Sequence, residues 1–409
     1  MALEVYGFTY AGKPLFSSCK DSEVSLTFYG TLSAIVSKVA SLLSDYTQED
    51  SLRYITAGRH QFVYLERGPL CYFGISKGTY TPLTVYRILS TIHLQVISIL
   101  TRGVERILLK RPSYDVQNLL GGTQFILQKL VDNLGGCLGI LDTSAYEALP
   151  LSQSSRDQLA TFFTNFKTDN ILCALLVVSD RVAVITTAKR VVLNPKDIII
   201  VINTIIASQS LQQQENWTPI CLPSYNDQAF TYAYIKYIEP GVGVVCISTR
   251  GDQEQFYILS GHLEDTSEKI IKSKCMDEVR TSLLETPLTF PSGEFKKCEI
   301  LHVLYHSLKL GQFFSSSFYN LTYGDFSHHI LSSYRMVSEL LHSSTHKRAA
   351  MISFEHINVY AEYNTDYVMY MATAPWTEIT TELVEKVAGY IYKHFSFLFI
   401  TKTPTITMN

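Results

Sequence analysis

The chain repeats one order of secondary-structure elements three times, and this repetition limits its fold more than any other feature of the sequence. Each copy begins with two β-rich runs around a turn, continues with a helix, adds further β-rich runs and ends with a second helix. This order is typical of an antiparallel sheet with helices packed on it. The 409 residues therefore predict an α+β chain of three tandem domains, each an antiparallel five-stranded sheet flanked by helices.

The opening hairpins are the first sign of the repeat. Each pairs two runs rich in β-branched and aromatic residues on either side of a turn signal. The paired runs are Leu3–Tyr10 with Leu15–Ser18, Ile171–Val178 with Val182–Thr187, and Glu299–Tyr305 with Gln312–Ser316. The first turn is Ala11-Gly12-Lys13-Pro14, in which glycine and proline are common turn residues.

A helix is predicted after each hairpin, because apolar residues there recur every three or four positions. In the first copy, the apolar stripe predicted to face the sheet consists of Phe28, Leu32, Ile35, Val36, Val39, Leu42 and Leu43. The second helix is predicted to begin at Asn194-Pro195, a capping residue followed by proline at the first helical position. The third is predicted to begin at Asp325.

Three further strands and a closing helix complete each predicted copy. The strands are Leu52–Ile55, Phe62–Glu66 and Leu70–Ser76; Phe230–Ile238, Gly243–Ser248 and Gln255–Leu259; and Met351–Phe354, Ile357–Tyr363 and Tyr367–Ala372. The closing helix of the second copy is predicted to run from about Asp265 to Leu284. Turn-rich stretches near 149–156 and 287–297 separate the copies. The predicted domains are therefore 1–148, 149–296 and 297–409.

Composition and charge narrow the classes of partner. The formal net charge is -3, so the chain as a whole has no electrostatic attraction for nucleic acid. The eight cysteines are scattered singly without zinc-ligand spacing, which is typical of buried thiols in a reducing compartment. The first residues lack the pattern of a signal peptide, and the apolar stretch 198–207 is too short to span a bilayer. These features predict a soluble cytoplasmic protein.

One string matches a catalytic motif. Gly74-Ile75-Ser76-Lys77-Gly78 fits the G-x-S-x-G pattern of hydrolases and follows a predicted strand. A nucleophile elbow needs a helix directly after the serine, yet residues 79–82 intervene and the predicted sheet is antiparallel. A turn is the favoured interpretation, and an enzyme acting through Ser76 is the weakest alternative.

The sequence predicts neither a metal nor a cofactor. His302 and His306 lie in a predicted strand without the glutamate of the H-E-x-x-H zinc motif. There is no G-x-x-x-x-G-K-[ST] or G-x-G-x-x-G string, so the chain itself is not expected to bind a nucleotide.

The outer face of the first predicted helix is the best candidate for a functional surface. It is small and carries one charge, whereas a free helix face is usually more charged. Its residues are Gly30, Thr31, Ser33, Ala34, Ser37, Lys38 and Ser41. Small neutral side chains let another chain approach closely, so the face suits a protein contact. The alternatives are a bland exposed face, or one covered by the chain's own helices near Gln117–Asn133.

Several strings in the chain resemble the SAND/Mon-one family of vacuolar fusion proteins. They are A-G-K-P at Ala11–Pro14, Ala57-Gly58 with Arg67–Leu70, YDVQNLLGGT at Tyr114–Thr123 and ENWTPICLP at Glu215–Pro223, the last being the most specific. The resemblance covers nearly the whole chain and implies three tandem longin-like domains. Members of the family usually carry a long polar N-terminal extension, whereas this sequence starts at its first strand. Regulation that depends on the extension is therefore in doubt.

The resemblance also implies a function. The family pairs with the Ccz-one protein, another triple-longin chain, and the heterodimer is the guanine nucleotide exchange factor of the late-endosomal Rab-seven GTPase. We therefore expect an obligate Ccz-one-type partner, a Rab GTPase as substrate, a third regulatory subunit, and peripheral recruitment to phosphoinositide-containing endosome, vacuole or lysosome membranes. Lys13 and Pro14 join the helix face as candidate contacts with the GTPase or the partner.

Two other functions stay open at this point. A passive longin scaffold would tether membranes and leave exchange to another subunit. Another triple-longin exchange subunit, of the Fuzzy or Hermansky–Pudlak type, would share the domain plan, but W-T-P-x-C-L-P at 217–223 argues against it.

Overall fold

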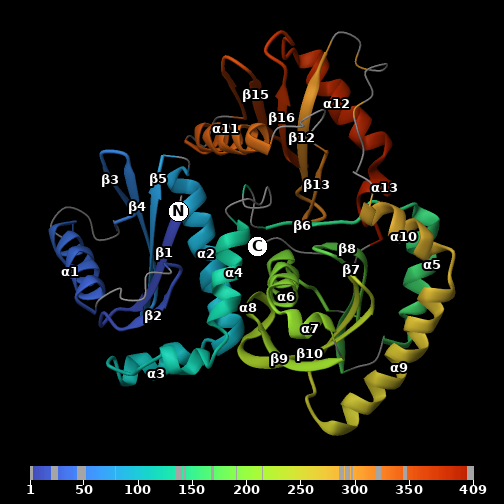
Figure 1. Ribbon diagram of the computed structural model, residues 1–409, viewed down its shortest axis with the longest axis horizontal. Helices are drawn as coiled ribbons and strands as arrows, with labels where there is room; N and C mark the ends of the chain where they lie inside the picture. Colours follow the sequence, from blue (N-terminus) through green and yellow to red (C-terminus); the bar gives the residue numbers. More distant parts are fainter. Residues whose placement is uncertain are drawn as a thin grey trace. The chain divides into compact units, whose positions relative to one another are not determined.

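The computed structural model describes residues 3–19, 26–43, 52–78, 80–134, 141, 144–166, 170–189, 191–213, 215–284, 290, 295, 298–317, 324–343 and 348–402. The chain divides into two compact units. The first comprises Met1–Leu141 with the short turn Asn226–Ala229, and the second comprises Asp142–Tyr225 with Phe230–Asn409. Figure 1 shows the course of the chain through both units. Each unit is described by itself.

The first unit contains a five-stranded antiparallel sheet in the order β2-β1-β5-β4-β3. Its strands are β1 (Leu3–Thr9), β2 (Pro14–Ser17), β3 (Tyr54–Ala57), β4 (His60–Arg67) and β5 (Leu70–Lys77). Helix α1 (Leu26–Leu43) lies on one face and α2 (Pro82–Leu100) on the other (Figure 1). The face under α1 is aromatic, with Tyr6, Phe8 and Phe73 in one buried cluster. The predicted hairpin, helix, three strands and helix are confirmed in this unit.

Between residues 101 and 134, short helices follow α2 in the first unit. They are α3 (Gly103–Lys110), the 3₁₀ helix η1 (Gln117–Leu120) and α4 (Gln124–Leu134). Both η1 and α4 pack against α2 and against the edge strand β2. Among the described residues, α2 alone is long and apolar enough to cross a membrane by length and composition. More than half of it is buried in the first unit, as in the core helix of a globular domain.

The second unit contains two sheets, of which the first has the order β8-β7-β11-β10-β9. Its strands are β7 (Ile171–Val178), β8 (Arg181–Thr187), β9 (Asn216–Leu222), β10 (Asp227–Glu239) and β11 (Val242–Ser248). The helices of this region are α5 (Gln153–Phe162), α6 (Pro195–Ala207), α7 (Gln209–Gln213), α8 (Pro223–Asn226), α9 (Gln253–Lys272) and α10 (Cys275–Leu284). Strand β7 is an interior strand and is buried along its whole length, as its unbroken apolar sequence requires.

One predicted strand of this sheet is wrong. Gln255–Leu259 forms the first turns of α9, because the Asp252 carboxylate accepts a hydrogen bond of 3.0 Å from the Gln255 backbone N–H and caps the helix. The strand that takes its place in the sheet is β9, which contains Trp217 and Pro219. A proline is tolerated there because β9 pairs on one side only.

The last sheet has six strands in the order β14-β15-β16-β12-β13-β6. They are β12 (Ile300–Ser307), β13 (Gln312–Ser315), β14 (Ala349–Ser353), β15 (Asn358–Tyr363), β16 (Tyr367–Thr373) and the two-residue β6 (Tyr146–Glu147). Helix α11 (Gly324–His342) packs on one face, and α12 (Thr381–Lys393) with α13 (Phe395–Leu398) on the other. The predicted five antiparallel strands are confirmed here, and β6 adds a sixth that is parallel to β13.

A short segment before α5 joins the two sheets of the second unit. Residues 146–147 pair with β13, while Ala148 bridges to Val182 in β8 and the Leu149 N–H donates to the Val182 carbonyl at 2.8 Å. Figure 1 shows β6 between β13 and β8. The predicted boundary between 148 and 149 therefore falls within one continuous piece of sheet structure. We call residues 146–149 the bridging segment.

Candidate protein-interaction surface

The first hairpin turn and α1 lie against each other. Gly12 has a φ of +72°, and a Cβ atom built on it would lie 3.6 Å from the Gly30 Cα. The Ser33 hydroxyl donates a hydrogen bond of 3.1 Å to the Tyr10 carbonyl oxygen. Two glycines thus allow close backbone approach, and a side-chain hydrogen bond fixes it. The structure therefore brings the candidates Lys13 and Pro14 together with those on α1.

Most of the predicted contact residues are exposed. Lys13 is exposed, whereas Pro14 and Ser33 are half-buried beside the helix. The other predicted residues of the helix face are all exposed: Gly30, Thr31, Ala34, Ser37, Lys38 and Ser41. Together with Tyr10 and the apolar residues Ile35 and Leu42 described below, these residues form what we call the hairpin-helix surface.

The core-facing stripe of α1 differs from the predicted one. Tyr29, Leu32 and Val36 are buried against the sheet, whereas Ile35 is 40% and Leu42 55% exposed. The reason is the aromatic packing under the helix, where the Tyr29 ring lies 6.2 Å from that of Tyr6. Turning Tyr29 into the core rotates Ile35 and Leu42 outward. The exposed face therefore carries two large apolar side chains two helical turns apart, which favours a protein contact more than small residues alone.

The surface has little charge and a rigid base. Lys38 is the single ionisable side chain of its helical part. Beneath it, the Tyr6 and Phe28 rings lie 5.0 Å apart, and burial raises the pKa of the Tyr29 hydroxyl, which stays neutral. A neutral, firmly supported helix face can be desolvated at low cost when another chain covers it.

The G-x-S-x-G string has a structural explanation. Ser76 lies within β5 and is buried, and no hydrogen bond to its hydroxyl is recorded among the described residues. A Cβ atom on Gly74 would lie 2.4 Å from the Val85 Cγ1, so the glycine is what lets α2 approach the sheet. Gly78 has a φ of +60° and follows the end of the strand. The contact between Gly74 and α2 explains the string by packing.

His302 of β12 is explained by its contacts in the core. One ring nitrogen of His302 contacts the Tyr334 hydroxyl at 3.0 Å and the other contacts the Ser315 hydroxyl at 3.1 Å. Burial lowers the pKa of His302 to about 3, so the ring is neutral at physiological pH. Within the described part of the chain, no three His, Cys, Asp or Glu side chains are placed to hold a metal ion.

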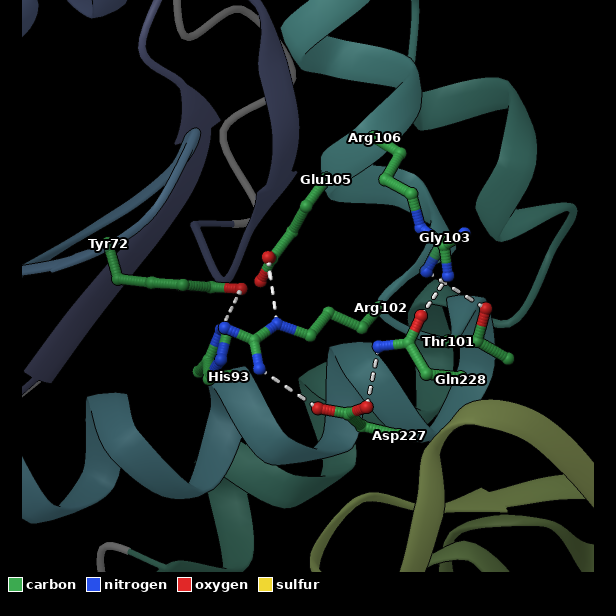
Figure 2. Close-up of polar contacts among 9 residues, drawn as sticks. All are labelled: Tyr72, His93, Thr101, Arg102, Gly103, Glu105, Arg106, Asp227 and Gln228. Carbon is green, nitrogen blue, oxygen red and sulfur yellow. Dashed lines mark hydrogen bonds and ion pairs between the residues drawn. The ribbon is translucent and has the colours of Figure 1, made fainter.

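Sequence reasoning missed a polar cluster at the corner between α2 and α3. The Arg102 guanidinium pairs with Glu105 at 2.9 Å and with Asp227 at 3.1 Å, as Figure 2 shows. Thr101, at the corner itself, has a φ of 58°, an uncommon conformation for a β-branched residue. Asp227 is 125 residues from Arg102 along the chain, so no local pattern could have signalled the pair.

A buried histidine lies beside this cluster. His93 contacts the Tyr72 hydroxyl at 3.2 Å, on the side of the sheet that faces α2 (Figure 2). Burial and the nearby cations Arg67 and Arg102 lower the pKa of His93 to about 4. The histidine is therefore neutral, Arg102 is paired, and the Arg106 guanidinium donates to the Gln228 side chain. These contacts fix the corner between α2 and α3.

Two protein families match the chain. The family described as "First Longin domain of FUZ, MON1 and HPS1" matches residues 5–130. The family described as "Second Longin domain of FUZ, MON1 and HPS1" matches residues 169–266. The two matched ranges fall within the first two predicted domains, and the hairpin-helix surface lies in the first matched range.

Whole-protein relatives are found in plants, animals and fungi. "Vacuolar fusion protein MON1 homolog" of Oryza sativa subsp. japonica is 31% identical over 278 residues, or 68% of this chain and 47% of the relative. "Protein SAND" of Takifugu rubripes is 27% identical over 407 residues, or 97% of this chain and 75% of the relative. "Vacuolar fusion protein MON1" of Cryptococcus neoformans is 28% identical over 382 residues, or 90% of this chain and 60% of the relative.

The chain spans about half the length of the plant relatives, at 47% and 44%, and three quarters of the fish relative. The shared longin domains, the relatives and the three-sheet architecture agree with one another. The chain belongs to the SAND/MON1 family of vacuolar fusion proteins.

Proposed function

We propose that this chain acts in vacuolar fusion traffic as one subunit of a heterodimeric guanine nucleotide exchange factor for a late-endosomal Rab GTPase of the Rab-seven type. Its partner is a second triple-longin chain of the Ccz-one type. The proposal is supported by membership of the SAND/MON1 family, whose members are named as vacuolar fusion proteins. Its work in the cell is endosome maturation and the fusion of vacuoles, lysosomes and autophagosomes.

The observation that carries the proposal is the hairpin-helix surface. Helix α6, which follows the second opening hairpin, has buried residues on several sides, including Asp197, Ile200 and Ile202. Helix α1 instead leaves Ala34, Lys38 and Leu42 exposed on its outer face. A helix with a firm aromatic base and a nearly uncharged outer face is suited to binding a partner helix or a GTPase.

Exchange needs no covalent chemistry. A factor that binds the nucleotide-free GTPase more tightly than the loaded form lowers nucleotide affinity by the same coupling free energy. The excess of GTP in the cell then refills the emptied site. Surface shape and desolvation are sufficient for this activity, and Ser76 has no part in it.

The complex is proposed to work at a membrane without spanning it. We propose peripheral recruitment from the cytoplasm to endosome, vacuole or lysosome membranes that contain phosphoinositides, with a third subunit as regulator. The chain's formal net charge of -3 provides no general attraction to anionic lipid, so the recruitment depends on local basic groups or on the partners.

Release of labelled GDP from the purified Rab GTPase tests the proposal. The rate is measured with the complex of chain and partner, with the partner alone and with the chain alone. Acceleration by the complex beyond either component supports the exchange function. A rate equal to that of the partner alone contradicts it and favours the passive scaffold, in which this chain only tethers.

A further inference from the structure

In the described residues, the edge strands of the three sheets are β2, β3, β6, β8, β9 and β14, and most of them are protected. The bridging segment contains β6 and covers β8, η1 and α4 pack against β2, and β9 carries Pro219. An exposed edge presents unpaired backbone groups that can pair with another chain, so proteins usually block it. Strands β3 and β14 lack such protection in the described structure. We consider β14 because it is the longer of the two and lies beneath a helix with exposed apolar residues.

The outward-facing backbone groups of β14 can be assigned from its pairing with β15. The Tyr363 N–H donates to the Arg348 carbonyl, and the Phe354 N–H donates to the Ile357 carbonyl, both at 2.8 Å. Hydrogen-bonded positions alternate in an antiparallel pair. The backbone N–H and C=O groups of residues 348, 350, 352 and 354 therefore point toward β15. The N–H and C=O groups of Ala349, Met351 and Ser353 therefore point away from the sheet. No hydrogen bond to these six groups is recorded among the described residues.

Apolar side chains lie on both sides of this edge. Met351 is 53% exposed on the face opposite α11. On α11, Ser338 accepts a hydrogen bond of 3.1 Å from Tyr370 in β16 and so marks the side nearer the middle of the sheet. Met336 and Leu340, each two residues from Ser338, lie on the opposite side of the helix, above the edge, and both are exposed.

The edge is complementary to itself. In an antiparallel pair of two β14 strands centred on Met351, Ala349 of each copy faces Ser353 of the other. All outward-facing groups then pair in one register, and any shift of two residues leaves some of them unpaired. Arg348 of each copy lies opposite Phe354 of the other, at the two ends of the paired strands. The Met336 and Leu340 side chains of the two α11 helices also meet, because the two-fold axis is perpendicular to the sheet.

We propose that β14 pairs with β14 of a second copy of this chain, antiparallel and centred on Met351, to form one continuous sheet. The proposal does not depend on exchange activity, because it concerns the third sheet and a homotypic contact. Its failure would leave the proposed function unaffected, and the reverse is also true.

Charge exchange at residue 351 tests the pairing. In sedimentation velocity of the full chain, the fraction of dimer should increase with protein concentration up to about 100 µM, as expected for a micromolar Kd. Met351→Lys and Met351→Glu each place like charges directly opposite each other and should weaken the dimer about tenfold or more. An equimolar mixture of the two variants should recover it. Leu109→Lys, at a 72% exposed position in the first unit, is the matched control and should dimerise like the wild type.

Cysteine cross-linking tests the register. The two Met351 Cα atoms would lie about 5.5 Å apart in a hydrogen-bonded pair, within the range of a disulfide. Met351→Cys should therefore form a covalent dimer under mild oxidation, at least about tenfold faster than Ser353→Cys, whose two copies would be roughly 14 Å apart. The wild-type chain gives the background from its own thiols.

Two results would overturn the proposal. One is a chain that stays monomeric across the concentration range. An extended segment of a different protein would then be the candidate for pairing with the β14 edge. The other is equal cross-linking at residues 351 and 353, or a mixture of charged variants that behaves like either variant alone. Recovery of the dimer in the mixture together with selective cross-linking at 351 would establish it.

Discussion

The guanidinium of Arg156 donates a hydrogen bond of 2.9 Å to the carbonyl oxygen of Phe397, which lies 241 residues further along the chain. The same group donates to the carbonyls of Leu149 and Ala183. Arg156 is buried, and burial lowers its pKa to about 10, so it remains charged at neutral pH. One buried cation thus joins the bridging segment, β8 and the last helix of the second unit.

Replacing this arginine should weaken the second unit. Arg156→Met leaves three carbonyl oxygens without their donor and should cost about 3 kcal/mol, which corresponds to a fall in Tm of roughly 5–10 °C. Differential scanning calorimetry measures the change. Arg53→Met, at an exposed cation, should shift the Tm by less than about 1 °C. An equal shift in both variants would show that the buried network contributes nothing.

Replacement of Gly74 should be tolerated only when the Val85 side chain of α2 is made smaller. Gly74→Ala forces a methyl group against Val85 and should cost about 1–3 kcal/mol. Val85→Ala alone removes buried methyl groups and should cost about 2 kcal/mol. In the double variant the new methyl fills part of the space left by Val85, so its cost should be below the sum by at least about 1 kcal/mol. Additive costs, measured by urea denaturation, would contradict the packing explanation.

Asp197 should make stability depend on pH. Its carboxylate is buried at the start of α6 and accepts a hydrogen bond of 2.9 Å from the Ser224 N–H. Burial raises its pKa to about 6, above the value of about 3.9 in an unfolded chain. The folded state therefore binds more protons between these values. The contribution of this group to the free energy of unfolding is fully present below about pH 4. It is lost as pH rises through about 6, a change of up to about 3 kcal/mol.

The variant Asp197→Asn isolates this contribution. The difference in unfolding free energy between wild type and variant should fall as pH rises from about 4 to 6, and then level off. Urea denaturation across this range measures it. If the difference in unfolding free energy is constant with pH, or grows as pH rises, then folding does not raise the pKa of the Asp197 carboxyl.

The hairpin-helix surface should be sensitive to charge. Ala34→Glu or Ser37→Glu places a carboxylate on a nearly neutral face and should weaken the complex with the partner or the GTPase by about tenfold or more. Because both positions are exposed, the Tm of the isolated chain should hardly change. Co-purification and labelled GDP release measure the effect. Leu109→Glu and Ser76→Ala are the controls and should retain wild-type exchange. Wild-type rates in both glutamate variants would exclude this face as the contact.

The sequence predicted most elements because their periodicity is local. The opening hairpins and the helices after them are visible as runs of alternating or 3.6-period apolar residues. Gln255–Leu259 misled the prediction because its aromatic and β-branched residues suggest a strand. The better signal was the capping pattern, aspartate at 252 followed by glutamine three residues later. The strand β9 was missed because Pro219 argues against a central strand and says nothing against an edge strand.

The candidate surface was only partly predictable. The small residues of α1 could be assigned to its outer face, but the outward turn of Ile35 depends on how Tyr29 packs against the sheet. The contact between the first turn and the helix depends on the approach of Gly12 to Gly30, which no spacing reveals. Arg102 and Asp227 are a tertiary pair, as are Arg156 and Phe397, and no local pattern encodes either.

The bridging segment also has a consequence for synthesis on the ribosome. Tyr146 contacts Gln312, which is 166 residues further along the chain, so its partner strand does not yet exist when the segment leaves the exit tunnel. At about 5–20 residues per second, translation of that stretch takes roughly 10–30 s. The second unit can therefore close only near the end of translation, and until then the bridging segment remains without its partner strand.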